Sequence, residues 1–265
     1  KRGLLSLDDE LSKFFPENPY KGITVYHLLT HTSGLPDFVQ TANCDEGRNS
    51  GLPEHVRTQL KELAKYPNLF EPGTKVMYAN INMIICALAI ENITGLSYSQ
   101  YMNENVFKPL GMNDAHIDNI DLQLEQRAKG YVKDGEQIVE ADRCLAWMMG
   151  AGDIVGTVDD VYCLNLAIKH KKLLKPETWE EILTPAPIGT FGMGCRINDW
   201  HGKKRIIHNG GCVGFRTLHI QLPEEDFDII FLSNAGWGDA RDDISEAIFK
   251  EYYGDSAKVW TDSAA

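Results

Sequence analysis

The last third of the chain alternates short β-rich runs with turns, and this pattern restricts the fold more than any other feature. Four runs cover residues 191–198, 203–211, 215–223 and 226–236, and the segments DWHGK, GCVG and PEED separate them. Strands joined by short turns pair with their sequence neighbours in antiparallel fashion. We therefore predict a four-stranded antiparallel meander, followed by a closing helix at 240–253.

Helical patterns dominate the sequence before this region. The apolar segment 81–94 predicts a buried helix that ends at Gly95, a residue type that favours the end of a helix. Residues 97–100 have the S-x-x-Q spacing of a capping box, and Thr157 with Asp160 repeats the device before another helix. Each signal indicates the start of a helix, because the first N–H groups of a helix lack partners within it and a capping side chain supplies an acceptor.

Three further segments complete the helical part. Thr24 is a suitable N-cap for a short helix over 25–31. The polar residues 41–51 predict a loop, and residues 53–66 predict an amphipathic helix that opens with proline. No internal periodicity marks a repeat architecture.

The predicted fold class is therefore α+β, an antiparallel sheet flanked by helices together with a mostly helical subdomain. We expect the mostly helical subdomain over residues 1–150, and a helix, the antiparallel sheet and a C-terminal helix over residues 151–265.

Composition excludes some classes of function. The formal charge is 26 − 38 = −12, and a surface of that sign repels phosphate backbones, so we expect no nucleic-acid partner. No apolar run reaches the roughly 18 residues of a membrane span. The six cysteines form no C-x-x-C pair and no disulfide framework, which favours a reducing compartment.

The stretch YHLLTHTSGLPD at 26–37 offers two catalytic hypotheses. His27 and His31 have the i, i+4 spacing that places two imidazoles on one helical face. A zinc protease site needs H-E-x-x-H, but leucine follows the first histidine here. Ser33 lacks the G-x-S-x-G surroundings of a nucleophile elbow, and serine before glycine is common turn chemistry. We therefore predict a structural segment, with neither a metal site nor a nucleophile at Ser33.

This stretch, extended to 23–37, resembles the landmark segment of the serine β-lactamase-like family, which includes class C β-lactamases, penicillin-binding DD-peptidases and related esterases. In that family the segment is structural and follows the catalytic serine. Residues 70–112 are similar to the region around the family's Tyr-x-Asn motif, residues 150–161 to its Gly-rich turn, and residues 206–217 to the strand that bears its third motif. The order of these segments carries the resemblance over nearly the whole chain.

The resemblance implies a β-lactamase/transpeptidase-like fold and acyl transfer through a serine ester, acting on amide or ester bonds without a metal or organic cofactor. Tyr78 would shuttle the proton, which its ordinary pKa near 10 allows only beside a cation or a proton-sharing lysine. Asn80 would hold the substrate amide and the catalytic lysine, and it is also a suitable N-cap for the helix that follows. A loop tyrosine that only packs at the helix start is the alternative for Tyr78.

The third motif is His208-Asn209-Gly210 where the family has Lys-Thr-Gly. We expect this strand to lie at a sheet edge along the cleft, with these three residues binding substrate and the Gly211 N–H serving in the oxyanion hole. His208 would supply a titratable donor instead of a permanent charge, and a buried strand histidine bonded to a carbonyl is the alternative. We expect Cys212 to be a packed strand cysteine.

The family's nucleophile motif, Ser-x-x-Lys, occurs nowhere in the 265 residues. One interpretation is that these residues are part of a longer hydrolase, with the nucleophile helix expected before Lys1. The other is a pseudoenzyme that binds ligands, or regulates, on the same fold. The resemblance also favours an extracytoplasmic location, against the cysteine pattern, so localisation stays open, as do the identity of the substrate and the oligomeric state.

Overall fold

The structure is a computed structural model that describes most of the chain. The described residues are 3–16, 18–37, 61–119, 121–141, 145–212, 214–238 and 240–254. The predicted loop at 41–51 and most of the predicted helix at 53–66 lie outside them.

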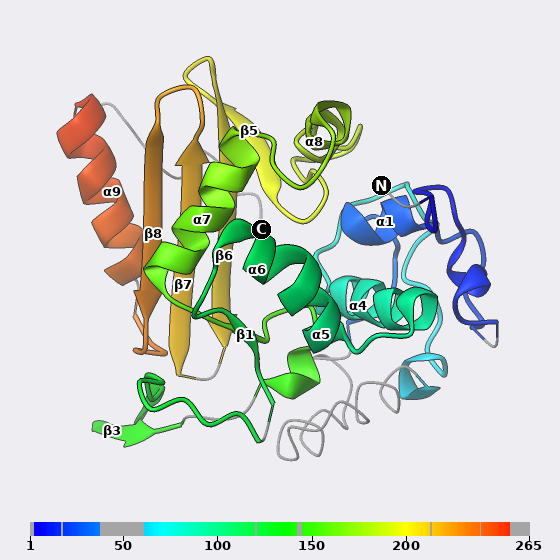
Figure 1. Ribbon diagram of the computed structural model, residues 1–265, viewed down its shortest axis with the longest axis horizontal. Coiled ribbons are helices and arrows are strands. Elements are labelled where there is room, and N and C mark those ends of the chain that lie inside the picture. Colours follow the sequence, from blue (N-terminus) through cyan, green and yellow to red (C-terminus); the bar gives the residue numbers. More distant parts are fainter. Residues whose placement is uncertain are drawn as a thin grey trace.

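The predicted meander forms the largest sheet, whose strands follow one another in the order β5-β6-β7-β8 (Figure 1). The strands are β5 (Arg196–Trp200), β6 (Lys203–Cys212), β7 (Phe215–Leu222) and β8 (Phe227–Ser233). Every neighbouring pair is antiparallel. The alternating runs therefore became strands in sequence order, which confirms both the meander and the α+β fold class.

Two helices cover opposite faces of this sheet (Figure 1). On one face, α9 (Ala240–Tyr253) inserts Phe249 against a cluster of sheet residues that includes Trp200, Leu218 and Ile220. On the other face, α7 (Val158–Lys169) bonds to the sheet through Asn165, whose Nδ2 donates to Asp228 at 2.7 Å. Alternate side chains of a strand point to opposite faces of the sheet, so each face has its own set of residues to bury. One helix packs on each face and buries them.

The helical part is built around one apolar helix, α4 (Asn80–Thr94). Its buried residues cover more than half of its circumference, and the partly buried Met83, Cys86 and Ile90 lie on the remaining side, as expected for a helix inside a core. It ends at Gly95, whose φ of +71° is left-handed, as predicted. Shorter elements surround it. They are η1 (Leu11–Lys13), α1 (Val25–Leu29), α5 (Tyr98–Met102), a π-helical turn (Asn103–Phe107) and α6 (Lys108–Leu110).

Several small elements escaped the sequence patterns. They are β1 (His116–Ile117), β2 (Tyr131–Asp134), β3 (Gln137–Glu140), η4 (Ala146–Met148), β4 (Ile154–Val155) and α8 (Pro176–Ile182). β1 pairs with β4, and β2 with β3, each antiparallel. The described part of residues 1–150 is therefore not helical throughout.

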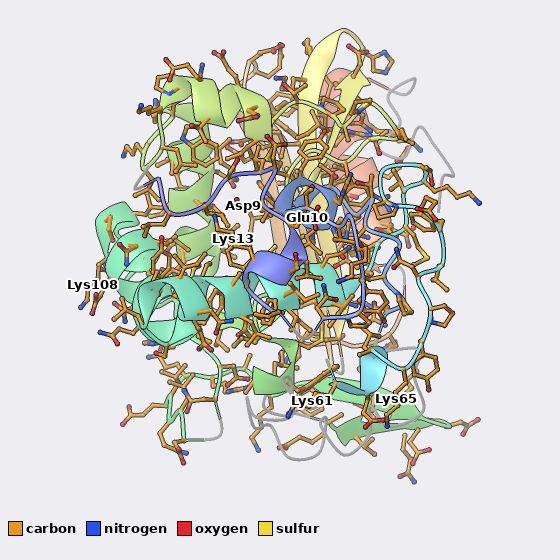
Figure 2. All side chains as sticks on the ribbon, turned by 90° about the vertical axis from the view of Figure 1, so that its right-hand side faces the viewer. Asp9, Glu10, Lys13, Lys61, Lys65 and Lys108 are labelled. Atoms are coloured by element: carbon orange, nitrogen blue, oxygen red, sulfur yellow. The ribbon has the colours of Figure 1, made fainter. Side chains whose placement is uncertain are left out.

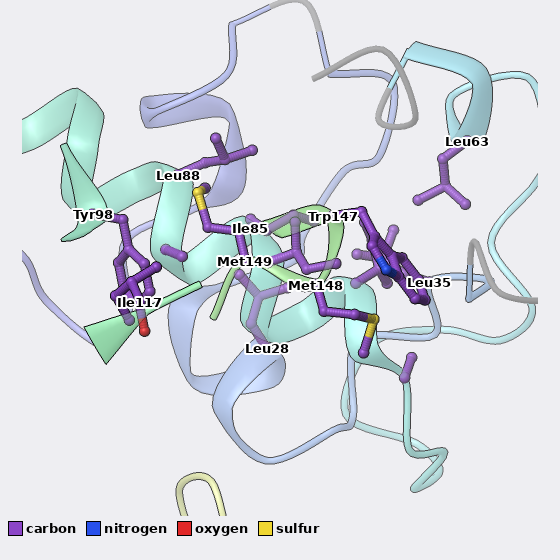
Figure 3. Packing of buried hydrophobic residues seen from close by; sticks show 14 of the residues in the cluster. Leu28, Leu35, Leu63, Ile85, Leu88, Tyr98, Ile117, Trp147, Met148 and Met149 are labelled. Atoms are coloured by element: carbon purple, nitrogen blue, oxygen red, sulfur yellow. The ribbon is translucent and has the colours of Figure 1, made fainter. Parts of the chain in front are cut away.

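The buried residues form two clusters. The larger one gathers Leu28 of α1, Ile85 and Leu88 of α4, and Trp147 and Met148 of η4 (Figure 3). The smaller one lies between the sheet and α9. The division of the chain into subdomains at residue 150 stays a prediction.

Charged side chains lie on the face of the molecule that carries η1 and α4 (Figure 2). Lys13 donates to Asp9 at 2.6 Å, an exposed i, i+4 pair of the kind that contributes little to stability. In the described part of the chain, no single helix is long and apolar enough to cross a membrane. Helix α4 and the helical segment Tyr98–Leu110 together have the length and composition of a membrane span, but the two helices are bent by 85° relative to each other.

Candidate active site

The segment 26–37 is a helix end followed by a turn. Helix α1 stops at Leu29, and His31 has a left-handed φ of +56°. The helix predicted through residue 31 is therefore two residues too long, and His27 and His31 do not share a helical face. His27 instead belongs to a capping box with Thr24. No group of three metal-binding side chains occurs among the described residues.

Ser33 has a structural role. It is 1% exposed, and its Oγ donates to the Oδ1 of Asn82 at 2.7 Å and accepts from the N–H of Leu35 at 3.2 Å. A hydroxyl held in this way inside the core ties the turn to α4 and does not face a substrate.

His31 supports the residues that enter α4. Its Nδ1 accepts from the N–H of Ala79 at 3.3 Å and lies 3.1 Å from Nδ2 of Asn82. Its ring packs on that of Tyr78, with 4.5 Å between ring centroids. Burial, then the charges of His208 and Arg196, lower the pKa of His31 to about 4. The imidazole is therefore neutral at pH 7, so its Nδ1 keeps a lone pair for Ala79.

Tyr78 and Asn80 point into the site from the start of α4. The Oη of Tyr78 donates to Oδ1 of Asn80 at 3.3 Å, a long bond. The Oδ2 of Asp37 accepts from both the backbone N–H and Nδ2 of Asn80, each at 3.0 Å. Ala79 is the N-cap residue, so the alternative role of Asn80 as N-cap is wrong. Asp37 sets the orientation of the Asn80 amide, which leaves Oδ1 toward Tyr78.

The phenol of Tyr78 holds its proton firmly. Burial raises its pKa above the ordinary value, the negative charge of Asp37 raises it further, and Arg196 opposes both. Within these residues Tyr78 is therefore a hydrogen-bond donor at pH 7. It needs a further cation to act as a base.

The third motif lies on β6 beyond the end of β5. Among the described residues, the last β5 partner on β6 is Ile207, and from His208 to Cys212 the strand pairs only with β7. This part of the strand is thus an edge, as expected, although β6 is an inner strand over its first half. Alternation places His208 and Gly210 on one face and Asn209 and Gly211 on the other.

His208 is exposed, not buried, which excludes the alternative of a buried strand histidine. Partial desolvation and then the charge of Arg196 lower its pKa, so the ring is neutral at pH 7. Gly210 lies where a Cβ would come within 2.4 Å of Oγ1 of Thr217. A side chain at position 210 would therefore force the Thr217 hydroxyl to move.

All six predicted site residues line one cavity of about 1490 Å³. Tyr78 and Asn80 come from the helical part, and His208, Asn209, Gly210 and Gly211 from the sheet. Cys212 also lines the cavity, and burial raises the pKa of its thiol, so it is not a thiolate. A substrate between the two walls would meet hydroxyl and amide groups on one side, and an imidazole and strand backbone on the other.

Sequence reasoning missed three residues of this site, namely Asp37, Phe191 and Arg196. Phe191 packs edge-on against His31, with 4.9 Å between ring centroids, and Arg196 lies over the Phe191 ring. Asp37 ends the segment 26–37, and no pattern in the sequence indicates a partner for its carboxylate. Arg196 sat in a run judged only for its strand pattern.

Two of the curated relatives of this chain are penicillin-binding proteins. Penicillin-binding protein 4* of Bacillus subtilis is 29% identical, over 88% of this chain and 56% of its own length. The putative penicillin-binding protein PbpX of the same organism is also 29% identical, over 88% of this chain and 57% of its own length. The chain thus spans little more than half the length of these curated relatives.

Solved structures agree on the fold. A penicillin-binding protein of Bacillus halodurans is 26% identical with a TM-score of 0.77, covering 93% of this chain and 79% of its own. A D-stereospecific amidohydrolase of a Streptomyces species has a TM-score of 0.78 at 22% identity, and the match covers 95% of this chain and 80% of the amidohydrolase. The family model described as beta-lactamase matches residues 1–250. Together with the cavity between Tyr78 and the β6 strand, this match shows that the chain belongs to the beta-lactamase family.

Proposed function

We propose that this chain forms the substrate cleft of a serine acyl hydrolase of the β-lactamase and penicillin-binding type, acting on amide or ester bonds through an acyl-enzyme. The observation that carries the proposal is the convergence of all six predicted residues, from two parts of the fold, on one cavity. The names of the relatives support it, since they include penicillin-binding proteins and an amidohydrolase.

The nucleophile comes from outside these residues. A serine hydroxyl needs a neighbouring base, and the 265 residues contain no Ser-x-x-Lys sequence that would place a lysine one helical turn after a serine. The raised pKa of Tyr78 fits this division, because its phenol awaits a cation that would let it release a proton. The 265 residues alone are therefore expected to be inactive.

Each wall of the cleft has a task in the reaction. Tyr78 would pass the proton from the nucleophile to the leaving group, and Asn80 would hold the substrate amide next to it. The Gly211 N–H would donate to the oxyanion of the tetrahedral intermediate. His208, Asn209 and Gly210 would bind the substrate along the strand edge.

The test uses the product of the complete gene and a chromogenic β-lactam together with an activated ester. We expect turnover by the complete product and none by the 265 residues. Tyr78→Phe should lower kcat about 10²- to 10⁴-fold, the usual contribution of a positioned proton-transfer group. Tyr252→Phe removes a hydroxyl from a tyrosine that is 71% exposed on α9 and should leave kcat unchanged. Turnover by the 265 residues alone, indifferent to Tyr78→Phe, would contradict both the proposed division and the site.

A ligand-binding or regulatory pseudoenzyme is the second candidate, and the missing Ser-x-x-Lys sequence favours it. Intact mass after incubation of the complete product with a β-lactam separates the two. A covalent adduct supports the hydrolase, whereas saturable binding without an adduct and without turnover supports the binding module.

A further inference from the structure

The end of the segment 26–37 is bonded to the first turn of α4. Ser33 donates to Asn82 at 2.7 Å, and both residues are buried in the core. Asp37 accepts instead from Asn80, the first residue of the helix, which lines the cavity. The bond from Asp37 therefore reaches a residue of the cleft wall, whereas the bond from Ser33 stays inside the core.

Asp37 binds Asn80 twice. Its Oδ2 accepts from the backbone N–H and from Nδ2 of Asn80, each at 3.0 Å. Asp37 is 5% exposed, and its Oδ1 has no hydrogen-bond partner among the described residues. The bond to the backbone N–H satisfies the start of a helix, which is a common role for a carboxylate. That role does not need the second bond, to the side chain of Asn80.

The second bond decides which end of the Asn80 amide faces Tyr78. An asparagine amide has an acceptor oxygen at one end and a donor NH₂ group of nearly the same shape at the other. The Asp37 carboxylate accepts from the NH₂ end, so Oδ1 of Asn80 is left for the phenol. The Oη of Tyr78 donates to this oxygen at 3.3 Å. A reversed amide would place its oxygen against the carboxylate oxygen, and the two acceptors would repel each other.

Charged and titratable groups from several elements surround Tyr78. Asp37 raises the pKa of the phenol, and Arg196 on β5 lowers it. The ring of His31 packs on the phenol, and His208 on β6 lines the same cavity. The pKa values of both histidines are lowered, so their rings are neutral at pH 7. Among these groups, Asp37 is the one that brings a negative charge.

We propose that Asp37 is a positioning residue of the acyl-transfer site, which holds the Asn80 amide with its oxygen toward Tyr78 and so presents an acceptor, not a donor, beside the phenol. The proposal rests on the proposed function for the reaction that the site serves. Asp37 is not among the residues that line the cavity, so it acts through Asn80 and not on the substrate. The oxygen of Asn80 is then ready to accept from an N–H group that enters the cleft beside Tyr78.

The first experiment measures kcat of the product of the complete gene with an activated ester, at the plateau of each pH profile. Asp37→Asn keeps the size of the side chain, but the new amide can bond to either end of the Asn80 amide. It should lower kcat about 10- to 100-fold, the cost of a misplaced group at a reacting centre. Asp228→Asn is the matched control, because Asp228 also accepts from an asparagine, Asn165, at 2.7 Å, but lies outside the cavity. It should leave kcat within about twofold.

A double-mutant cycle tests whether Asp37 acts through Asn80. In an Asn80→Ala background, the loss caused by Asp37→Asn should shrink to about twofold or less, because the residue that Asp37 orients is gone. An equal loss in both backgrounds, or no loss from Asp37→Asn alone, would show that Asp37 does not position Asn80.

The pH profile separates positioning from mere capping of α4. Asp37→Asn removes a negative charge that raises the pKa of Tyr78. The limb of the profile that disappears in Tyr78→Phe should therefore move to lower pH. Arg196, His31 and His208 are unchanged in this variant. A loss of stability with an unchanged kcat and an unchanged profile would mean that Asp37 only caps the helix.

The second experiment needs neither turnover nor a substitution. Hydrogen exchange of the Asn80 side-chain amide is followed by NMR in the 265 residues and compared with that of Asn209, an exposed asparagine that also lines the cavity. The Asn80 amide should exchange about tenfold more slowly, because Asp37 holds it. Equal exchange would overturn the proposal. If exchange is slowed but the complete product hydrolyses nothing, the proposed function is wrong and the orientation of Asn80 by Asp37 stands.

Discussion

At the scale of single residues, the site depends on His31, a buried histidine that is not among the residues lining the cavity. His31 is 1% exposed, and its Nδ1 satisfies the N–H of Ala79, just before α4 begins. Its ring packs against Tyr78, so one side chain fixes both the backbone and the phenol. Burial accounts for its lowered pKa, and the neutral form is the one that accepts.

Replacing His31 with phenylalanine tests this role. The ring contact with Tyr78 remains, but the buried N–H of Ala79 loses its acceptor, which costs about 1–3 kcal/mol of unfolding free energy. Denaturant unfolding measures this loss. His201 shares the left-handed backbone, with a φ of +52°, but is exposed, so His201→Phe is the matched control. Equal losses in both variants would show that backbone strain, not the Ala79 bond, is being measured.

At the scale of elements, helix starts are fixed by hydroxyl caps that also join distant segments. Thr157 accepts from the N–H of Asp160 at 3.2 Å and donates to Oδ2 of Asp160 at 2.8 Å. The other oxygen of Asp160 accepts from the N–H of Asp114. The capping box at the start of α7 therefore holds the loop before β1 as well as its own helix.

Thr157→Ala should lower the unfolding free energy by about 1 kcal/mol, the typical loss of an N-cap hydroxyl. Thr157→Ser keeps the hydroxyl and should recover most of that stability in the same thermal or denaturant unfolding experiment. No difference between alanine and serine would mean that the cap bond contributes nothing.

A glycine sets how closely two elements pack. Gly150 has a left-handed φ of +76°, and a Cβ there would lie 2.7 Å from Cβ of Ala87 and 2.9 Å from the carbonyl of Met83, both on α4. Gly150→Ala should therefore lower the unfolding free energy by more than about 1 kcal/mol, because alanine strains the left-handed backbone and its Cβ clashes with the backbone and side chain of α4. Gly135 has a left-handed φ of +61°, and a Cβ there would meet no described atom within 4 Å, so Gly135→Ala serves as the comparison. Equal unfolding free energies for the two variants would refute the packing argument.

At the scale of the whole molecule, stability depends on a buried carboxyl group. Asp153 is 1% exposed, its Oδ1 accepts from the N–H of Gly150, and its Oδ2 has no partner among the described residues. Burial raises the pKa of Asp153 to about 7, and the nearby charge of Asp118 contributes. The folded state thus holds a proton that the unfolded chain releases near pH 4.

The unfolding free energy should fall as the pH rises from about 4 to about 7 and should level off above, because the folded state binds more protons than the unfolded state across that window. Asp153→Asn removes this contribution, so the variant should gain stability relative to the native protein as the pH rises. Denaturant unfolding from pH 4 to pH 8 measures the difference. Asp8→Asn, at an exposed position, is the control, and a difference for Asp153→Asn that does not vary with pH would contradict the assignment.

The sequence by itself determined the main helices, the four strands of the large sheet and the resemblance to the family. Alternating runs and turns predicted the four strands, Gly95 and Thr157 marked helix boundaries, and the motifs around Tyr78 and His208 carried the resemblance. These features are local. A periodic pattern indicates which side of an element is buried, and a cap or turn residue indicates the local backbone conformation that it favours. The same logic failed at His31, because its left-handed backbone, directly after the C-cap residue Thr30, depends on contacts with residues far along the chain.

Only the tertiary structure decided the site. It placed Tyr78 opposite His208, turned Asp37 toward Asn80, set Arg196 on the Phe191 ring, and paired β1 with β4 although each has only two residues. Such contacts join residues far apart in the sequence and leave no periodic trace in it. Their geometry follows from how the helical core packs against the sheet, which is why the motif residues were visible in the sequence but their partners were not.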